Sequence, residues 1–261
     1  MMTRILVALL VVVVLLTTAC QPGRASAAAG SAVGADSAEN APAETGADPA
    51  KVVILVDQTA SMTWSQTAPV TVASLKPLIE QLRAVSGELG LGMIRDRSGL
   101  GLIRLRIDPA PPVSERRQRT RKAFTDLRNA QEDRRVEALE REQLENWKVD
   151  TGERVDRFLS QASALLEKQV EAHCTDIWGA FLRADGFLSE DEPAWPKDYL
   201  RAAVLVTDGQ HNCGAVVPPA LRSNASWLLV HGAGTVGRLD SLKPRRFEAI
   251  EAAVRYLIGG R

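Results

Sequence analysis

Short apolar runs alternate with amphipathic segments along much of the chain. Four such runs, rich in Val, Ile and Leu, are separated by helical patterns: Lys51–Val56, Leu100–Ile107, Ala202–Val206 and Trp227–Val230. Strands that are apolar on both faces and alternate with helices are typical of a parallel sheet covered by helices on both sides. The pattern therefore predicts an α/β fold with a doubly wound, mostly parallel sheet.

A further apolar run predicts a hairpin at one edge of this sheet. Leu89–Ile94 and Gly101–Ile107 are joined by a short polar stretch that contains Asp96 and Gly99. Both residue types favour tight turns. We therefore expect one antiparallel edge strand.

Two segments carry apolar residues on a single helical face. The first lies between the first strand and the hairpin, and its apolar positions are Val72, Leu75, Ile79, Leu82 and Val85. Pro77 falls inside it and marks a kink or a restart. The second segment ends the chain, with Phe247, Ile250, Val254 and Leu257 at helical spacing. This second pattern predicts a last helix that packs on the sheet.

The segment at about residues 112–150 departs from the alternation, because it is highly charged. Its apolar positions hold no single heptad register, so a long coiled coil is not expected. We predict a charged helical insertion that is mostly solvated. The alternative is an arm that binds a partner or touches the envelope, with Trp147 and the basic cluster at 116–122 as contacts. Asp150 with Glu153 resembles a capping box and predicts that a new helix starts there.

The chain begins with the pattern of an export signal at residues 1–19. Arg4 supplies a positive charge, Ile5–Leu16 is apolar, and small residues precede Cys20. This arrangement resembles the lipobox of bacterial lipoproteins, with Thr17 where that family usually has Leu. The resemblance implies that the Cys20 thiol receives a diacylglycerol and becomes the mature amino terminus. An uncleaved anchor is the alternative, although the apolar run is short for a membrane span.

Residues 20–50 follow as the lipidated cysteine and a tether. They are rich in Ala, Gly, Ser and Glu and contain no aromatic residue, so we expect them to be disordered. This leaves residues 51–261 as the folded domain. The lipoprotein resemblance places that domain in the cell envelope, anchored to the membrane and facing outward. Because Gln21 follows the cysteine, it implies the outer membrane and periplasm if the host has two membranes.

The charge balance excludes one class of partner. Lysine plus arginine and aspartate plus glutamate are equal, at 32 each. Without a net positive field, nothing in the composition recruits nucleic acid. We therefore expect no nucleic-acid partner.

Oxygen-bearing side chains follow two of the predicted strands and recur between them. Asp57, Thr59 and Ser61 lie in VVILVDQTASM, Thr175 lies in CTDIWGAF, and Asp208 lies in VLVTDG. In open parallel sheets the carboxyl ends of the strands share one edge, so Asp57 and Asp208 are expected there together. Carboxylate and hydroxyl oxygens suit a hard divalent cation. The alternative is that each aspartate simply caps a following helix.

These motifs, in this order, resemble the von Willebrand factor A family across residues 51–261, interrupted by the charged insertion. The family's first motif is usually Asp-x-Ser-x-Ser, and here Thr59 replaces the middle serine with a donor of the same kind. The resemblance implies a Rossmann-like fold and a metal-ion-dependent adhesion site. It also implies a protein-binding rather than a catalytic role, with no catalytic residue.

The resemblance further implies how the metal is held. The hydroxyls of Thr59 and Ser61 would bind the ion directly, Asp57 and Asp208 partly through water, and Thr175 directly or through water. Mg²⁺ is the implied ion, with Mn²⁺ or Ca²⁺ as alternatives, because the protein ligands are few and waters complete the shell. The implied partner is a protein that supplies an acidic residue to the ion.

Two catalytic functions and one structural role are the alternatives to this function. Asp57 after a strand is similar to the nucleophile of haloacid-dehalogenase-type phosphatases, but Thr59, two residues on, replaces their second aspartate and removes the general acid. A serine hydrolase built on Ser61 would lack the Gly-x-Ser-x-Gly elbow. A structural envelope lipoprotein with a non-functional metal site is the remaining alternative.

Cys174 and Cys213 remain once Cys20 is assigned to lipid. An even pair of cysteines in an exported protein predicts a disulfide. Cys174 precedes Thr175 and Cys213 follows Asp208, so the bond would join two ligand loops. A zinc site that adds His173 and His211 is an alternative, although the usual Cys-x-x-Cys spacing is absent. Two free thiols are the third possibility.

Overall fold

The computed structural model describes residues 48–59, 62, 68–98, 101–112, 125–168, 174–213, 220–231, 239 and 243–259, with only the backbone for 125–129. All of them belong to one compact unit, Thr45–Arg261. The predicted signal peptide, the tether up to residue 47, and Cys20 lie outside the described residues. Among the described residues, no helix combines the length and apolarity that crossing a membrane requires.

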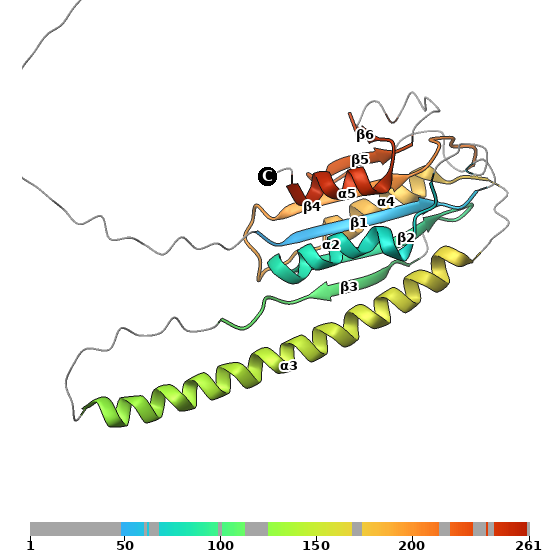
Figure 1. Ribbon diagram of the computed structural model, residues 1–261. Helices are drawn as coiled ribbons and strands as arrows, with labels where there is room; N and C mark the ends of the chain where they lie inside the picture. The colour runs from blue at the N-terminus through green and yellow to red at the C-terminus, as the bar shows by residue number, and fades with distance from the viewer. Residues whose placement is uncertain are drawn as a thin grey trace, which may run out of the picture. The chain divides into compact units, whose positions relative to one another are not determined.

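A six-stranded mixed sheet forms the centre of the unit (Figure 1). Its strand order is β3-β2-β1-β4-β5-β6. The strands are β1 (Ala50–Asp57), β2 (Gly87–Ile94), β3 (Ile103–Ile107), β4 (Leu200–Val206), β5 (Ser226–Val230) and β6 (Arg245–Phe247). Every neighbouring pair is parallel except β2 with β3. The predicted α/β class and the antiparallel edge hairpin are both confirmed.

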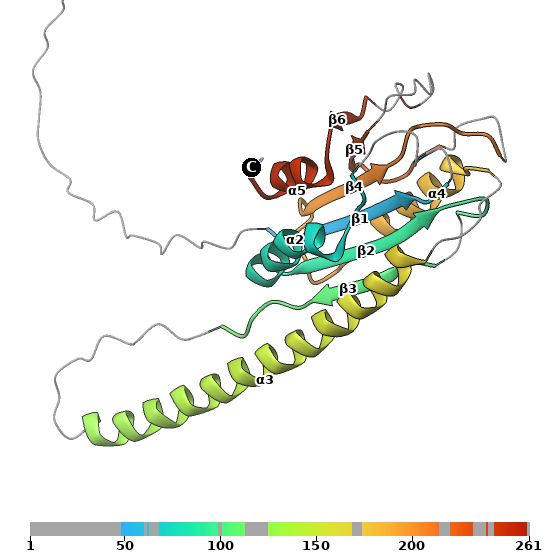
Figure 2. The same ribbon diagram turned by 45° about the vertical axis from the view of Figure 1, so that its right-hand side comes forward.

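Four helices in the described part cover the two faces of the sheet: α2 (Val72–Val85), α3 (Thr125–Glu167), α4 (Ile177–Leu188) and α5 (Ile250–Gly259). Alternate residues of β1 point to opposite faces, so Val52 and Ile54 enter one core while Val53 and Leu55 enter the other. Helices α2, α3 and α5 pack on the first face, and α4 packs on the second (Figure 2). Every residue of β1 is buried, which explains its continuous apolar run.

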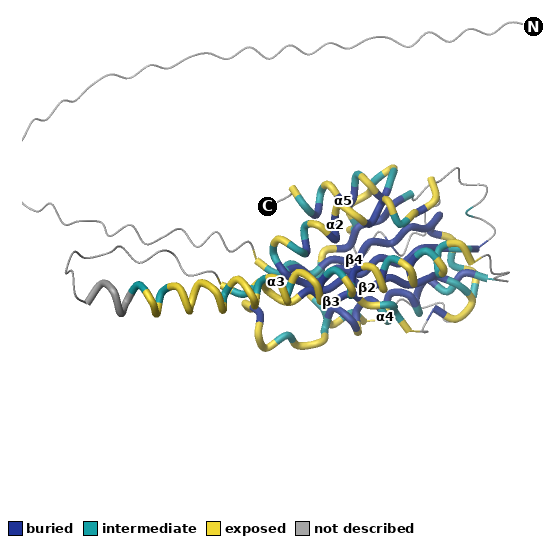
Figure 3. The backbone as a smooth tube through the Cα atoms, turned by 60° about the horizontal axis from the view of Figure 1, so that its bottom comes forward, coloured by how far each residue is buried: buried dark blue, intermediate teal, exposed yellow. Residues whose placement is uncertain are grey.

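Helix α3 is one continuous helix of 43 residues, so the predicted start of a new helix at Asp150 is wrong. Asp150 lies inside it and pairs with Arg154 one turn later, at 2.6 Å. From 130 to 150 most side chains are exposed, as expected for a solvated helix, and Leu139 is 54% exposed (Figure 3). The carboxyl-terminal part buries Val155 and Phe158 against the sheet.

The other correction concerns Phe247, which closes β6 and does not belong to the last helix. Helix α5 begins at Ile250. The ring of Phe247 nevertheless lies 5.6 Å from that of Tyr256 in α5. Because Phe247 packs on the helix from the neighbouring strand, its spacing to the helical residues imitates one helical face.

Close packing on the second face requires glycine in β2. A Cβ atom at Gly92 would lie 2.7 Å from Leu102 Cδ2 and 2.8 Å from Arg183 Nη2. The same Arg183 nitrogen donates a hydrogen bond to the Met93 carbonyl, at 2.8 Å. This arginine is therefore fixed against the strand where a side chain would otherwise sit.

Gly92→Ala is expected to destabilise the protein by about 1 kcal/mol, the low end for overpacking, because the added methyl displaces the ends of two flexible side chains. Gly186→Ala is the matched control, since a Cβ there meets nothing within 4 Å and the position is inside α4. It should raise the free energy of unfolding by about 0.5–1 kcal/mol. Urea denaturation of both variants measures the difference, and equal effects would contradict the packing.

Opposite the carboxyl ends of the strands, a cluster of charged side chains surrounds Lys51, which is fully buried at 0% exposure. Its Nζ lies 2.9 Å from Glu192 Oε1 and 3.5 Å from Glu88 Oε2. Glu88 also pairs with Arg104 at 2.8 Å, and Glu192 pairs with Arg106 at 2.9 Å. Each buried charge thus has a partner of opposite sign, which burial in a protein interior demands.

Candidate metal site

Asp57 ends β1 and is held by donors from two loops. Val56 pairs with Val206 of β4, so the residues that follow these strands are neighbours. Thr207 Oγ1 donates to Asp57 Oδ2 at 2.7 Å. Thr59 donates to Asp57 Oδ1 from its backbone nitrogen at 2.9 Å and from its hydroxyl at 2.7 Å. The carboxylate is 4% exposed and its position is fixed by these three bonds.

Thr175 joins this group from the loop that precedes α4. Its hydroxyl donates to the hydroxyl of Thr59, with the oxygens 3.1 Å apart. Thr175 is 1% exposed and Thr59 is 5% exposed. Three segments that are distant in the sequence therefore bring their oxygens to one buried point at the carboxyl edge of the sheet.

Asp208 completes the group and has an unsatisfied oxygen. Its Oδ1 accepts a hydrogen bond from the Gln210 nitrogen at 3.0 Å. Its Oδ2 is buried and has no hydrogen-bond partner among the described residues. A buried carboxylate oxygen without a partner is costly, and a bound cation would remove that cost.

The electrostatics of Asp57 point the same way. Burial raises the pKa of Asp57 above its ordinary value, although the hydrogen bonds from Thr207 and Thr59 oppose the rise. The negative charge of Asp208 raises that pKa further. Two buried carboxylates that repel each other form a site for which a divalent cation is the natural counter-charge.

The residues present therefore fit a hard divalent cation. Asp57, Thr59, Thr175 and Asp208 come together, and the remaining predicted ligand, Ser61, lies outside the described residues. No group of three or more His, Cys, Asp or Glu side chains suited to a metal occurs in the described part of the chain. The candidate site is of another kind, because half of its donors are hydroxyls.

No protein-family model matches this chain, and no curated protein matches it.

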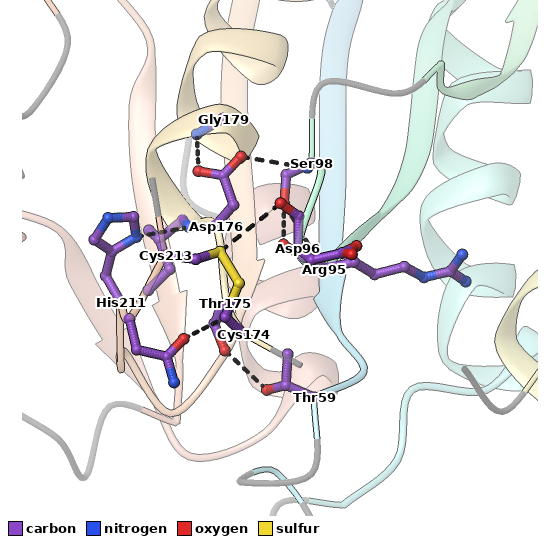
Figure 4. The surroundings of a disulfide bond; sticks show 12 residues. Thr59, Arg95, Asp96, Ser98, Cys174, Thr175, Asp176, Gly179, His211 and Cys213 are labelled. Atoms are coloured by element: carbon purple, nitrogen blue, oxygen red, sulfur yellow. Dashed lines mark hydrogen bonds between the residues drawn. A yellow bond between two sulfur atoms is a disulfide. The ribbon is translucent and has the colours of Figure 1, made fainter. Parts of the chain in front are cut away.

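Cys174 and Cys213 form a disulfide, as predicted, with their Cα atoms 5.4 Å apart (Figure 4). The zinc and free-thiol alternatives fall, because bonded sulfurs are not available as thiolate ligands. The bond joins the loop of Thr175 to the loop that follows Asp208.

Asp176 fixes the start of α4 beside the site, a role the sequence analysis missed. Its Oδ1 accepts from the Gly179 nitrogen at 2.9 Å, which makes it the N-cap of the helix. Its backbone nitrogen donates to the Arg95 carbonyl at 2.8 Å (Figure 4). The signal for this cap, an aspartate directly before an apolar helical run, is present in the sequence.

Gln58 links the loop that follows β1 to α3, and no sequence pattern pointed to it. Its Nε2 donates to the carbonyls of Leu165 and Leu166, at 3.1 Å and 3.3 Å. Arg95 Nη2 donates to its Oε1 at 2.7 Å. Because the last carbonyls of a helix lack intrahelical partners, Gln58 satisfies the end of α3 while its neighbours Asp57 and Thr59 face the site.

Proposed function

We propose that this chain is a lipid-anchored domain of the von Willebrand factor A type that binds a protein partner through a divalent cation. Mg²⁺ is the proposed ion, with Mn²⁺ or Ca²⁺ as substitutes. The observation that carries the proposal is the buried, unpartnered Oδ2 of Asp208, whose carboxylate interacts with that of Asp57, together with the linked oxygens of Asp57, Thr59 and Thr175.

The donor set explains why such an ion would favour a partner. When bound, the ion supplies a positive charge that an external carboxylate can approach. Thr59 and Thr175 contribute neutral hydroxyls, so they leave more of that charge uncompensated than carboxylates would. Asp57 has both oxygens engaged by Thr207 and Thr59, which suits a carboxylate that acts through water. An acidic side chain of a partner protein would then complete the shell.

We favour binding over catalysis because Asp57, Thr59 and Thr175 bond to one another, and the one oxygen of the site without a hydrogen-bond partner among the described residues, Asp208 Oδ2, is buried. Thr59 and Thr175 donate their hydroxyl protons within the site, and Asp57 accepts three hydrogen bonds. A nucleophile or general base needs a free lone pair directed at a substrate.

The proposed location is the cell envelope, facing outward. Cys20 would carry the lipid, and the residues between Cys20 and the start of β1 at Ala50 would tether the domain. The disulfide between Cys174 and Cys213 supports an oxidising compartment, where such bonds persist.

Metal binding by the full chain tests the proposal. Calorimetric titration with Mg²⁺ or Mn²⁺ should show one site. An ion concentration of about 100 times Kd should raise the free energy of unfolding by about 2.7 kcal/mol. Proteins captured from an envelope extract in Mg²⁺ should be released by a chelator. No heat and no stabilisation with either ion at millimolar concentration would reject the site and leave a structural role.

A further inference from the structure

Residues 211–213 run alongside residues 174–177 and hold them at several points. The disulfide joins Cys213 to Cys174, and His211 Nδ1 accepts a hydrogen bond from the Ile177 nitrogen at 3.2 Å (Figure 4). Asn212 lies between these two contacts and bonds to Thr175. We call residues 211–213 the clamp.

Asn212 forms hydrogen bonds with both the backbone nitrogen and the carbonyl of Thr175. Its side-chain Oδ1 accepts from the Thr175 nitrogen at 2.5 Å, and its own nitrogen donates to the Thr175 carbonyl at 3.3 Å. Both peptide groups that flank the Thr175 Cα are thus fixed. Threonine is branched at Cβ, so a fixed backbone leaves its hydroxyl few possible positions.

The position selected is the one that faces the site, because the Thr175 hydroxyl lies 3.1 Å from that of Thr59. We propose that Asn212 is a positioning residue that holds Thr175 ready to bind the ion. This inference rests on the proposed function. It adds that the threonine is fixed before the metal arrives, by a residue that contributes no oxygen to the ion.

The two neighbours of Asn212 fix the position of the clamp, residues 211–213, relative to residues 174–177. Cys213 is tied covalently to the residue before Thr175, and His211 is bonded to the first residue of α4. Asn212 is therefore held between two anchors, which keeps its amide oxygen aimed at the Thr175 nitrogen.

Asn212 is exposed while Thr175 is buried. A substitution at Asn212 can therefore change the position of Thr175 without removing a buried side chain. Asn212→Ala should weaken Mn²⁺ binding to the oxidised full chain by about 10-fold, within the range found for residues that orient metal ligands. Solvent exchange of the Thr175 amide should become at least about 10-fold faster, because the amide loses its acceptor. Thermal unfolding should change little, as at most exposed positions.

Two further variants separate positioning from general destabilisation. Asn212→Asp keeps an oxygen in the same place and should bind Mn²⁺ at least as tightly as the unaltered chain. Gln210→Ala, an exposed position on the same loop, should leave affinity within about 2-fold. Calorimetry with Mn²⁺ and amide exchange by nuclear magnetic resonance measure all three variants.

The outcomes distinguish the inference from the proposed function. If the unaltered chain binds Mn²⁺ and Asn212→Ala binds it within 2-fold as well, the inference is wrong and the metal site stands. Loss of affinity that tracks a fall in melting temperature, without rescue by Asn212→Asp, also overturns it. If the unaltered chain binds no Mn²⁺, the proposed function fails and the inference fails with it.

Discussion

Replacing Asp57 with asparagine is expected to weaken the binding of Mg²⁺ or Mn²⁺ by at least about 100-fold without unfolding the protein. Residues that only orient a ligand already account for about 10–100-fold in affinity, and Asp57 also supplies one of the two negative charges. Asparagine keeps the size of the side chain and one oxygen for Thr59. In the metal-free protein, the change also removes the repulsion between Asp57 and Asp208.

Stability and affinity should therefore move in opposite directions in Asp57→Asn. Without metal, the variant should unfold at the same urea concentration as the unaltered chain or a higher one. Asp96→Asn is the control, because it removes the same charge from an exposed residue on a neighbouring loop and should leave affinity within about 2-fold. If Asp57→Asn bound the ion as tightly as the unaltered chain does, the Asp57 carboxylate would not be part of the metal site.

Lys51→Met is expected to lower the free energy of unfolding by about 3–5 kcal/mol. Methionine keeps the apolar stem but removes the ammonium that compensates two carboxylates, whose side chains are 5% exposed in Glu88 and 6% in Glu192. Removing one partner from a buried ion pair costs this much in comparable cases. Without Lys51, each glutamate would keep, among the described residues, only its half-exposed arginine, Arg104 for Glu88 and Arg106 for Glu192. Because whole domains are stable by only about 5–15 kcal/mol, the loss would be large.

Urea denaturation measures this loss against a surface control. Lys148→Met removes an exposed pair with Glu145, whose side chains are 52% and 60% exposed, and should cost less than about 1 kcal/mol. Adding Glu192→Gln to Lys51→Met should recover part of the stability, since it removes one of the two carboxylates that have lost the ammonium of Lys51. A loss below about 1 kcal/mol in Lys51→Met would mean that the cluster contributes little.

The pH dependence of stability gives an independent check. Burial alone would raise the pKa of Glu192, but the hydrogen bond and charge of Lys51, with the charge of Arg106, lower it overall. A carboxyl with a lowered folded pKa stabilises the protein above its unfolded pKa of about 4.3 and loses that contribution as the pH falls through the folded value. Lys51→Met should therefore lose less stability than the unaltered chain between about pH 5 and pH 3.

The sheet was predictable because its buried strands have no polar face. Continuous apolar runs identified β1, β4 and β5, and turn residues identified the hairpin of β2 and β3. Strand β6 was missed because it has only three residues, of which Arg245 and Arg246 are exposed. The continuity of α3 was missed because a capping pattern at Asp150 looks the same in sequence whether or not the helix has already begun.

The proximity of Asp57 and Asp208 was predictable from the sequence, whereas the residues that support the candidate site were not. Asp57 and Asp208 stand directly after strands, so topology alone placed them on one edge. The carbonyls that Gln58 binds, those of Leu165 and Leu166, are 107 and 108 residues away in the chain, and no local pattern connects them to Gln58. The contact of Asn212 with Thr175 depends likewise on how two distant loops align, which only the folded chain determines.

The cross-link between Cys174 and Cys213 also decides how the protein should be prepared. The two residues are 39 positions apart. A disulfide that closes a loop of this size lowers the conformational entropy of the unfolded chain and so stabilises the folded protein by about 4 kcal/mol. Heterologous expression in a reducing cytoplasm would yield a dithiol form without this advantage and with one anchor of Asn212 missing. Secretion to an oxidising space, or refolding in a glutathione buffer, yields the disulfide-bonded form, and a thiol assay confirms it before use. Affinities for Mg²⁺ or Mn²⁺ should be measured on this form.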